Sequence, residues 1–372
     1  MKFLRNLKEK DIAGKTAVLR LDLNVEPDEL VCFSSGCHNW KIDSIKPTID
    51  WLLKNKVKSV VILSHRGRPT SGDFKKFSLD FLLPVLEKLI RQEIVFWPNF
   101  DFAKLKKTMA AKPGIYLLEN LRFLPGEKNN DRQLASQLAG LGDFYVNDAF
   151  AVSHRADASI VAITEFLPSY AGLLLEKEIE NLKSVLNDKQ KRLVVILGGA
   201  KVSDKIGLIG NFYDKAGHFL IGGAIANTFL AAKGLPVGES LIDEKGIDFA
   251  KKYIDEKKII LPIDLKISGK QILDIGSETL KYYASFLRQA ETVIWNGSMG
   301  YVEKNDFRQG TAGLWKIIAS LKKTRVIVGG GDTIASKPKN IKSGPNLFIS
   351  TGGGAMLDYL SGKKLPGIEA LD

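Results

Sequence analysis

The chain has 372 residues, of which 45% are hydrophobic and 26% are charged, as is typical of a globular protein with a sizeable core. This length is enough for about two domains. The sequence has no run of about 18 uncharged apolar residues, and residues 1–15 lack the apolar segment of a signal peptide. We therefore expect a cytoplasmic protein with no membrane partner.

The formal net charge of +12 could attract nucleic acid, a membrane surface or small anions such as phosphates. Its lysines are scattered among acidic residues, as in 251–258 and 181–191, which is typical of solvated helix faces and not of one basic stripe. The sequence also lacks an aromatic RNA-binding platform and a basic zipper. Small anionic substrates are therefore favoured over a nucleic-acid partner.

The two cysteines, Cys32 and Cys37, are followed directly by His38. A structural zinc site needs four spaced ligands, and this short stretch does not supply them. We therefore expect a reduced surface loop here.

Short runs rich in β-branched residues alternate with longer amphipathic stretches along the whole chain, as in βα units around parallel sheets. About eleven strands are expected on this pattern. They lie at 16–23, 59–64, 93–97, 115–120 and 144–149 in the first half, and at 192–199, 218–223, 258–264, 292–297, 325–331 and 347–354 in the second. The fold class predicted is α/β, with two doubly wound parallel-sheet domains.

A helix is expected between the two halves, over residues 172–188. Its apolar residues recur near helical spacing, its acidic residues come early and its lysines late, as the helix dipole favours. It either connects the domains or is one more crossover helix, and periodicity alone does not separate these readings.

First-half strands end in polar and charged residues. In open α/β sheets ligands bind at the carboxyl ends of strands, and the planar arginine fork grips phosphate or carboxylate with two hydrogen bonds. Any one such arginine alone is more simply an ordinary surface residue, but several together indicate an anion site. The residues are Asp22, Asn24, His65, Arg66, Arg68, Asn120, Arg122, Asn147, Asp148, His154 and Arg155.

Second-half strands end in glycine instead, which lets backbone approach a bulky ligand and lets helix N-termini hold phosphate oxygens. Tight turns explain any single glycine pair about as well, but the recurrence favours a nucleotide bed. Neither the P-loop spacing nor G-x-G-x-x-G is present. The glycines lie at 198–199, 222–223, 297, 329–331 and 352–354.

Lys201 and Lys205 follow the first glycine pair. As an exposed i, i+4 pair opening a helix they would oppose the helix dipole, so a nearby anion is the better explanation.

The stretches "LRLDLNV", "SHRGRP", "LLENLRF", "YVNDAF", "LGGAKVSDKI", "ANTFL", "WNGSMG", "GGGDT" and "STGGGAMLDYLSGKKLPG" resemble the phosphoglycerate kinase family in content and order. The resemblance covers essentially the whole chain. It implies reversible, magnesium-dependent phosphoryl transfer between 1,3-bisphosphoglycerate and ADP, giving 3-phosphoglycerate and ATP. It further implies a monomer that closes by bending between its domains.

By the same resemblance, residues 1–171 form the 3-phosphoglycerate-binding domain, with the tail 356–372 packing back on it, and 189–355 form the nucleotide-binding domain. The acid substrate is then bound by Asp22, Asn24, His65, Arg68, Arg122 and Arg155. Gly198, Gly199 and Gly223 lie near the adenosine, Glu303 at the ribose, Lys201 and Lys205 at phosphates, and Asp332 at Mg²⁺. Asn296, Gly330, Gly331 and Thr333 also contact the nucleotide, while Lys41, Lys201, Gly353 and Gly354 serve the transferred group.

The sequence departs from the family pattern at several positions. Lys41 stands where the family has a catalytic arginine, with Ile42 and Pro47 in register. Losing the bidentate fork there costs roughly 1–3 kcal/mol at the transition state. This predicts a working but slower kinase, with a catalytically weak, ligand-binding relative as the alternative. Further departures are Ala151, Asp157, Ser277, Ser298, Tyr301 and Val302.

Overall fold

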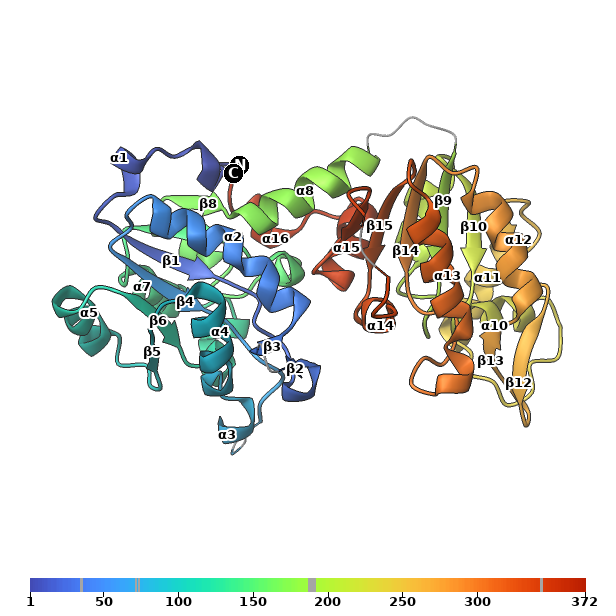
Figure 1. Cartoon of the computed structure of the whole chain (residues 1–372), viewed down its shortest axis with the longest axis horizontal. Helices are drawn as coiled ribbons and strands as arrows, with labels where there is room; N and C mark the ends of the chain where they lie inside the picture. The colour runs from blue at the N-terminus through green and yellow to red at the C-terminus, as the bar shows by residue number, and fades with distance from the viewer. Residues whose placement is uncertain (34–35, 71, 73, 187–191, 342–343) are drawn as a thin grey trace. The chain divides into compact units, whose positions relative to one another are not determined.

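The computed structural model describes residues 1–33, 36–70, 72, 74–186, 192–341 and 344–372, without the side chains of 31–33 and 36–38. The chain divides into two compact units. The first unit comprises Met1–Ile179 and Lys364–Asp372, and the second comprises Glu180–Lys363. Each unit is built around a parallel sheet (Figure 1), which confirms the predicted fold class.

The sheet of the first unit has six strands in the order β5-β6-β4-β1-β7-β8, all parallel. Five of these strands match the runs expected from sequence. The sixth, β8, is a three-residue edge strand that was not expected. The strands are β1 Thr16–Arg20, β4 Ser59–Leu63, β5 Ile94–Trp97, β6 Ile115–Leu118, β7 Phe144–Asn147 and β8 Ser169–Ala171.

The central strands of this sheet are buried and mostly apolar because helices cover both faces. All five residues of β4 are buried, as are all four of β6. Helices α2 and α4 lie over one face of the sheet (Figure 1), and their buried apolar residues share one core with those of β4 and β6. The helices of this unit are α1 Glu9–Ile12, α2 Trp40–Lys54, α3 Phe74–Phe77, α4 Leu83–Ile90, α5 Phe102–Ala111, α6 Pro125–Lys128 and α7 Arg132–Ala139, with the tail helix α16 Pro366–Glu369.

The sheet of the second unit also has six parallel strands, in the order β11-β10-β9-β14-β15-β16. All six were expected from sequence. They are β9 Leu193–Leu197, β10 Ala216–Ile221, β11 Ile259–Ile260, β14 Thr292–Asn296, β15 Arg325–Gly329 and β16 Leu347–Ile349. Its helices are α9 Ile206–Phe212, α10 Gly223–Ala232, α11 Ile247–Tyr253, α12 Ser277–Leu287, α13 Gln309–Ser320, α14 Gly331–Ala335 and α15 Gly353–Leu360.

Two short antiparallel hairpins were not expected from sequence. β2 (Val31–Phe33) pairs with β3 (Gly36–His38), and their register sets Cys32 opposite Cys37. The cysteine side chains lie outside the described part of the structure. In the second unit β12 (Leu265–Ser268) pairs with β13 (Gln271–Ile275).

The helix expected over 172–188 is α8, Leu173–Leu186, and residues 187–188 lie outside the described residues. The boundary between the two units falls within α8, so this helix belongs partly to each. Its N-terminus is capped by Asp148, whose Oδ1 accepts the backbone N–H groups of Leu174 and Leu175 at 2.9 and 3.0 Å. Among the described residues, no helix is both long enough and apolar enough to cross a membrane.

The C-terminal tail returns to the first unit from Lys364 onward, later than the residue 356 expected from sequence. The difference arises because α15 stays with the second unit, where Asn211 of α9 donates a hydrogen bond to the carbonyl of Leu360. Within the first unit, Asn147 donates to the carbonyl of Gly367 at 3.1 Å. The N-terminal amine forms an ion pair with Asp372 at 2.6 Å.

Candidate active site

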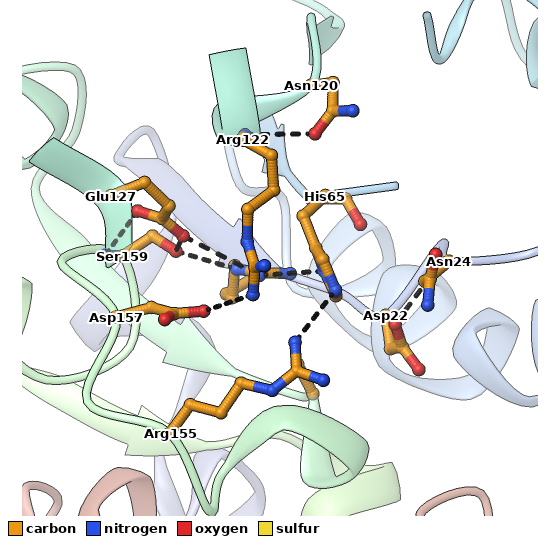
Figure 2. Close-up of polar contacts among 12 residues, drawn as sticks. Asp22, Asn24, His65, Asn120, Arg122, Glu127, Arg155, Asp157 and Ser159 are labelled. Atoms are coloured by element: carbon orange, nitrogen blue, oxygen red, sulfur yellow. Dashed lines mark hydrogen bonds and ion pairs between the residues drawn. The ribbon is translucent and has the colours of Figure 1, made fainter. Parts of the chain in front are cut away.

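The polar residues predicted to bind an anion come together in the first unit. They follow β6, β4, β1 and β7, which are consecutive neighbours in the sheet, so the carboxyl ends of these strands meet at one edge. Figure 2 shows His65, Arg122 and Arg155 converging there, with Asp22 and Asn24 beside them. We call this group, together with Arg20, the acid cluster, because it is the site predicted to bind the acid substrate.

The floor of the acid cluster is the buried residue Arg20 at the end of β1. Its Nε donates to Ser159 Oγ at 2.8 Å, and a second guanidinium nitrogen lies 3.9 Å from a carboxylate oxygen of Glu127. Ser159 in turn donates to Glu127 at 2.6 Å. Burial raises the pKa of Glu127, although Arg20 and Ser159 act in the opposite direction. These contacts fix the Arg20 guanidinium under the cluster.

His65 lies between two guanidinium groups. Its Nδ1 is 3.3 Å from a nitrogen of Arg20, and its Nε2 is 3.3 Å from a nitrogen of Arg155. Burial, reinforced by Arg20, Arg122, Arg155 and Lys41, lowers the pKa of His65 well below its ordinary value. The ring is therefore neutral, and a neutral imidazole accepts only one hydrogen bond.

Ser159 and Glu127 fix the Arg20 guanidinium so that one of its N–H groups faces Nδ1 of His65. We therefore assign the accepting nitrogen of His65 to Nδ1 and the proton to Nε2. The Nε2–H then points toward a guanidinium that has no acceptor to offer. An anion placed between His65 and Arg155 would accept from both groups. This arrangement suits a phosphate or carboxylate oxygen.

Arg122 lies above this floor and forms an ion pair with Asp157 at 3.1 Å, both side chains being 6% exposed. Its Nε is buried and has no hydrogen-bond partner within the described structure. Burial and the neighbouring Arg122 lower the pKa of the half-buried Arg155. Asp157 and Asp22 act in the opposite direction on Arg155, so the positive charge of these two arginines is partly offset.

The remaining acid-cluster candidates lie around its rim. Asn24 accepts the backbone N–H of Gly67 at 2.8 Å, and Asp22 accepts that of Asn24 at 3.3 Å. Lys41 is at the second position of α2 and acts on His65 electrostatically, while Arg68 is exposed on the loop after β4.

Arg66 is the exception among the arginines that the sequence pattern grouped together. Its guanidinium donates to the carbonyls of Val25 and Ser78 at 3.1 and 3.2 Å and pairs with Glu26 at 2.7 Å. It also lies 4.4 Å from the ring centroid of Phe81. Arg66 therefore holds loops together and is not available to an anion.

The second unit has a pocket of about 550 Å³, in the range expected for a nucleotide or other small ligand. It lies at the ends of β9, β10 and β14. Of the predicted site residues in the described chain, Gly199, Gly223, Glu303 and Asp332 line it, and so do Ser298 and Tyr301. Apolar residues on its wall include Leu241, Leu265 and Met299.

Two of the glycines there serve backbone packing. A Cβ on Gly198 would lie 2.1 Å from the carbonyl oxygen of Ser298, and one on Gly297 would lie 2.1 Å from the carbonyl oxygen of Gly198. Gly199 and Gly297 also have positive φ angles of 89° and 97°. The turns after β9 and β14 can therefore lie against each other only as bare backbone.

Lys205 and Asn296 form a buried pair beside the pocket. The Nζ of Lys205 donates to Oδ1 of Asn296, and burial lowers the pKa of Lys205 to about 8. The Nδ2 of Asn296 is buried without a partner among the described residues, and Thr333 accepts the N–H of Gly297 at 2.9 Å. An unpaired buried donor next to a buried ammonium fits a ligand rich in acceptor oxygens.

Lys201 is exposed on the loop before α9, which begins only at Ile206. The two lysines are thus not an i, i+4 pair on a helix, and that alternative is wrong. Gly353 begins α15, where a Cβ on it would lie 3.0 Å from Cα of Gly330. Gly354 has no such neighbour, and Asp332 is exposed in the first turn of α14.

Sequence reasoning missed Arg20, Glu127 and Asp274 as members of these sites. Asp274 of β13 lines the pocket, and burial raises its pKa to about 6 although Gly310 and Ile275 donate backbone hydrogen bonds to it. Arg20 had a detectable signal, since a charged residue inside an apolar strand needs a buried partner. Asp274 belongs to a hairpin that was not expected, and Glu127 to a short helix that carries no strand-end signal.

The acid cluster lies at the carboxyl ends of one sheet's strands, and a nucleotide-sized pocket lies at the carboxyl ends of the other's. Together they define a two-domain α/β enzyme of the phosphotransferase class. The comparisons with known proteins agree. The sequence pattern of the phosphoglycerate kinase family matches residues 7–363. The phosphoglycerate kinase of Pseudothermotoga lettingae is 40% identical, covering 98% of each chain, and that of Desulfovibrio desulfuricans is 41% identical with the same coverage.

Solved structures agree as well. The crystal structure of phosphoglycerate kinase from Pyrococcus horikoshii OT3 matches with a TM-score of 0.88 and 30% identity, over 100% of this chain and 98% of the other. The Coxiella burnetii enzyme matches with a TM-score of 0.80 and 34% identity, over 99% and 98%.

The chain belongs to the phosphoglycerate kinase family. It is a glycolytic phosphotransferase that moves a phosphoryl group reversibly between 1,3-bisphosphoglycerate and ADP, giving 3-phosphoglycerate and ATP. The comparisons lend no support to the alternative of a catalytically weak relative.

Proposed function

We propose that the acid cluster of the first unit binds 3-phosphoglycerate and 1,3-bisphosphoglycerate. The observation that carries this proposal is the convergence of His65, Arg122 and Arg155 at the ends of neighbouring strands. A three-carbon acid phosphate presents two anionic groups, and the guanidinium forks and the Nε2–H of His65 supply matching donors. In this proposal Asp22 and Asn24 accept hydrogen bonds from the substrate hydroxyl, and the exposed Arg68 adds positive charge.

The pocket of the second unit is proposed to bind ADP and ATP. Its apolar wall and the glycine turns at Gly199 and Gly223 suit a flat base, and Glu303 is placed to accept hydrogen bonds from ribose hydroxyls. Lys201, Lys205 and the unpaired amide of Asn296 supply charge and donors for phosphates. Gly198 contributes by letting the two turns pack, and Gly330, Gly331 and Thr333 form the neighbouring turn that supports Gly297.

Phosphoryl transfer needs no nucleophilic side chain, because catalysis rests on in-line positioning and on neutralising charge at the moving oxygens. In this proposal Lys201 and Lys41 supply positive charge to the transferring group. The backbone N–H groups of Gly353 and Gly354, at the start of α15, donate hydrogen bonds to the same oxygens in this proposal. The chain's own residues therefore bind, orient and stabilise charge.

Asp332 fits the magnesium site that the reaction implies. Mg²⁺ is usually bound through one or two carboxylates together with substrate phosphates, and Asp332 is an exposed carboxylate on the wall of the nucleotide pocket. Among the described residues, no group of three or more His, Cys, Asp or Glu side chains could hold a metal on its own. When bound, Mg²⁺ neutralises phosphate charge.

A monomer acting in the cytoplasm is also proposed. This part of the proposal is supported by the resemblance of the sequence to the phosphoglycerate kinase family. Because the phosphoryl group passes directly between substrates, the two must meet in the reacting complex. We propose that bending near α8, which contributes residues to both units, allows this.

The test is ATP formation from ADP and 1,3-bisphosphoglycerate, with and without Mg²⁺, in the wild type and in Lys201→Ala. The turnover number is expected to fall about 10²- to 10³-fold in Lys201→Ala and to be lost when Mg²⁺ is chelated. Lys251→Ala, which removes an exposed lysine paired with Asp248 in the same unit, is the matched control and should behave as wild type. Activity that survives Lys201→Ala or chelation would contradict the proposed site.

A further inference from the structure

Asp157 places a buried carboxylate among the arginines of the acid cluster, which suit a bound anion. It is 4% exposed, and its Oδ2 accepts a hydrogen bond from Arg122 at 3.1 Å (Figure 2). Asp157 also acts electrostatically on Glu127 and on Arg155. The carboxylate therefore belongs electrostatically to the acid cluster and is not a separate surface ion pair.

The pairing of charges in the acid cluster is uneven. The two most buried arginines each have a carboxylate, Arg20 having Glu127 and Arg122 having Asp157. Their contribution to the net charge of the cluster is therefore largely cancelled. The charges that remain are the positive charges of Arg155, Arg68 and Lys41 and the negative charge of Asp22, which acts on Arg155.

The two paired arginines differ in how completely their donors are used. Arg20 donates to Ser159, to the carbonyl of Leu21 and toward His65, so its guanidinium is fully engaged. Arg122 gives one nitrogen to Asp157, and its buried Nε has no partner in the described structure. A buried guanidinium with an N–H group that lacks an acceptor is suited to exchange one carboxylate for another anion.

We propose that Asp157 lowers the affinity of the acid cluster for the acid substrate by competing with it for Arg122. The proposal rests on the acid cluster being the 3-phosphoglycerate site. An incoming phosphate or carboxylate must share or displace the Asp157 contact, and it meets the negative charge of Asp157 at close range. The affinity for the acid substrate is therefore set below the level that the arginines alone would give.

The variant that tests this is Asp157→Asn, which keeps the size and one hydrogen-bond acceptor and removes the charge. The KM for 3-phosphoglycerate is expected to fall about fivefold or more, with the KM for ATP unchanged and kcat changing less than the KM for the acid. Inorganic phosphate, as a competitive inhibitor, should bind more tightly by a similar factor. Asp157→Glu restores the charge and should keep the KM near the wild-type value.

A purely structural role for Asp157 predicts a different pattern. Loss of the buried partner would then lower the melting temperature and leave the KM for the acid unchanged or raised. In our account, inorganic phosphate takes over the partner's role, so it raises the melting temperature more in Asp157→Asn than in wild type. If Asp157→Asn does not fold, Asp157→Ser also removes the charge, and the rise in its melting temperature with phosphate can be compared with that of wild type in the same way.

Two further variants separate the possible failures. Glu165→Gln removes the carboxylate from the ion pair with Arg132, outside the acid cluster, and should leave the KM unchanged. Arg122→Ala should raise the KM for 3-phosphoglycerate. If Arg122→Ala has no effect, the proposed acid site itself is wrong. If Arg122→Ala raises the KM while Asp157→Asn leaves it unchanged or raises it, only the competition by Asp157 is overturned.

Discussion

The acid cluster of the first unit and the pocket of the second unit both suit anionic ligands, but they do so with different atoms. The acid cluster uses buried side chains that are held by one another, as Arg20 is held by Glu127 and Ser159. The pocket uses turns whose backbones touch, as at Gly198 and Ser298. Both types of site occupy the carboxyl ends of parallel strands, so the fold sets the place and the local residues set the chemistry.

This difference predicts different sensitivities to substitution. In the acid cluster, a change of charge should alter affinity for one substrate while the protein remains folded. In the pocket, an added methyl group at a packed turn should affect folding before it affects binding. The following variants test that contrast.

The largest effect is expected at the packed turn. Gly198→Ala would place a Cβ 2.1 Å from the backbone oxygen of Ser298, and backbone cannot move aside as the end of a side chain can. The free energy of unfolding should fall by about 3 kcal/mol, lowering the melting temperature by roughly 5–10 °C. Thermal denaturation followed by circular dichroism measures this.

Gly210→Ala is the matched control for that variant. Gly210 lies in α9 and has no atom within 4 Å of the added Cβ. Alanine favours a helix over glycine by about 0.5–1 kcal/mol, so this variant should be as stable as wild type or more so. Equal stability of both alanine variants would show that the turn has room that the structure does not show.

A smaller effect is expected at Lys41. Lys41→Arg restores a planar fork at the N-terminus of α2, within electrostatic reach of His65. The turnover number should rise by about fivefold, which corresponds to the low end of the range of roughly 1–3 kcal/mol for a bidentate contact. Lys46→Arg, on the same helix and paired with Asp50 at the surface, is the control and should change nothing. Unchanged or lower turnover in Lys41→Arg would remove Lys41 from the catalytic group.

The smallest expected effect is a pH dependence at Lys205. Burial lowers its pKa to about 8, so the ammonium loses its proton as the pH rises through that value and its attraction for phosphate weakens. The KM for ADP should rise a few-fold between about pH 7.5 and 9. Lys205→Arg stays charged over this range, so its KM should stay flat, and a parallel rise in both proteins would assign the titration to another group.

The lowered pKa of Lys205 also makes the free energy of unfolding depend on pH. The folded-state pKa of Lys205 lies below the unfolded value of about 10.4, so the buried ammonium costs stability below pH 8. That cost is relieved as the pH rises from 8 toward 10.4. Comparing the pH dependence of the melting temperature in wild type and Lys205→Arg measures it.

The strands that could be predicted from sequence are those whose residues are buried on both faces. All residues of β4 and β9 are buried and nearly all are apolar, because helices cover each face of their sheets. β8 was missed because it is an edge strand of only three residues, two of them half-buried, and so gives no apolar run. β12 and β13 were missed because they are partly exposed and lack such a run.

The candidate site could be placed at strand ends, but its internal pairing could not be predicted. Arg66 and Arg122 both follow apolar runs, yet one is used to tie loops together and the other faces the acid cluster. That difference depends on partners far apart in the chain, Glu26 and Asp157. Likewise, Gly198 and Gly199 are adjacent, but only Gly199 is among the described residues that line the pocket.

The central claim is that the acid substrate binds in the first unit and the nucleotide in the second. A crystal structure of the full chain with 3-phosphoglycerate and ADP tests it most directly. We expect the acid to contact His65, Arg122 and Arg155, and the base of ADP to lie against Gly199 and Gly223. Acid bound away from those three residues, or both ligands found in one unit, would contradict the account.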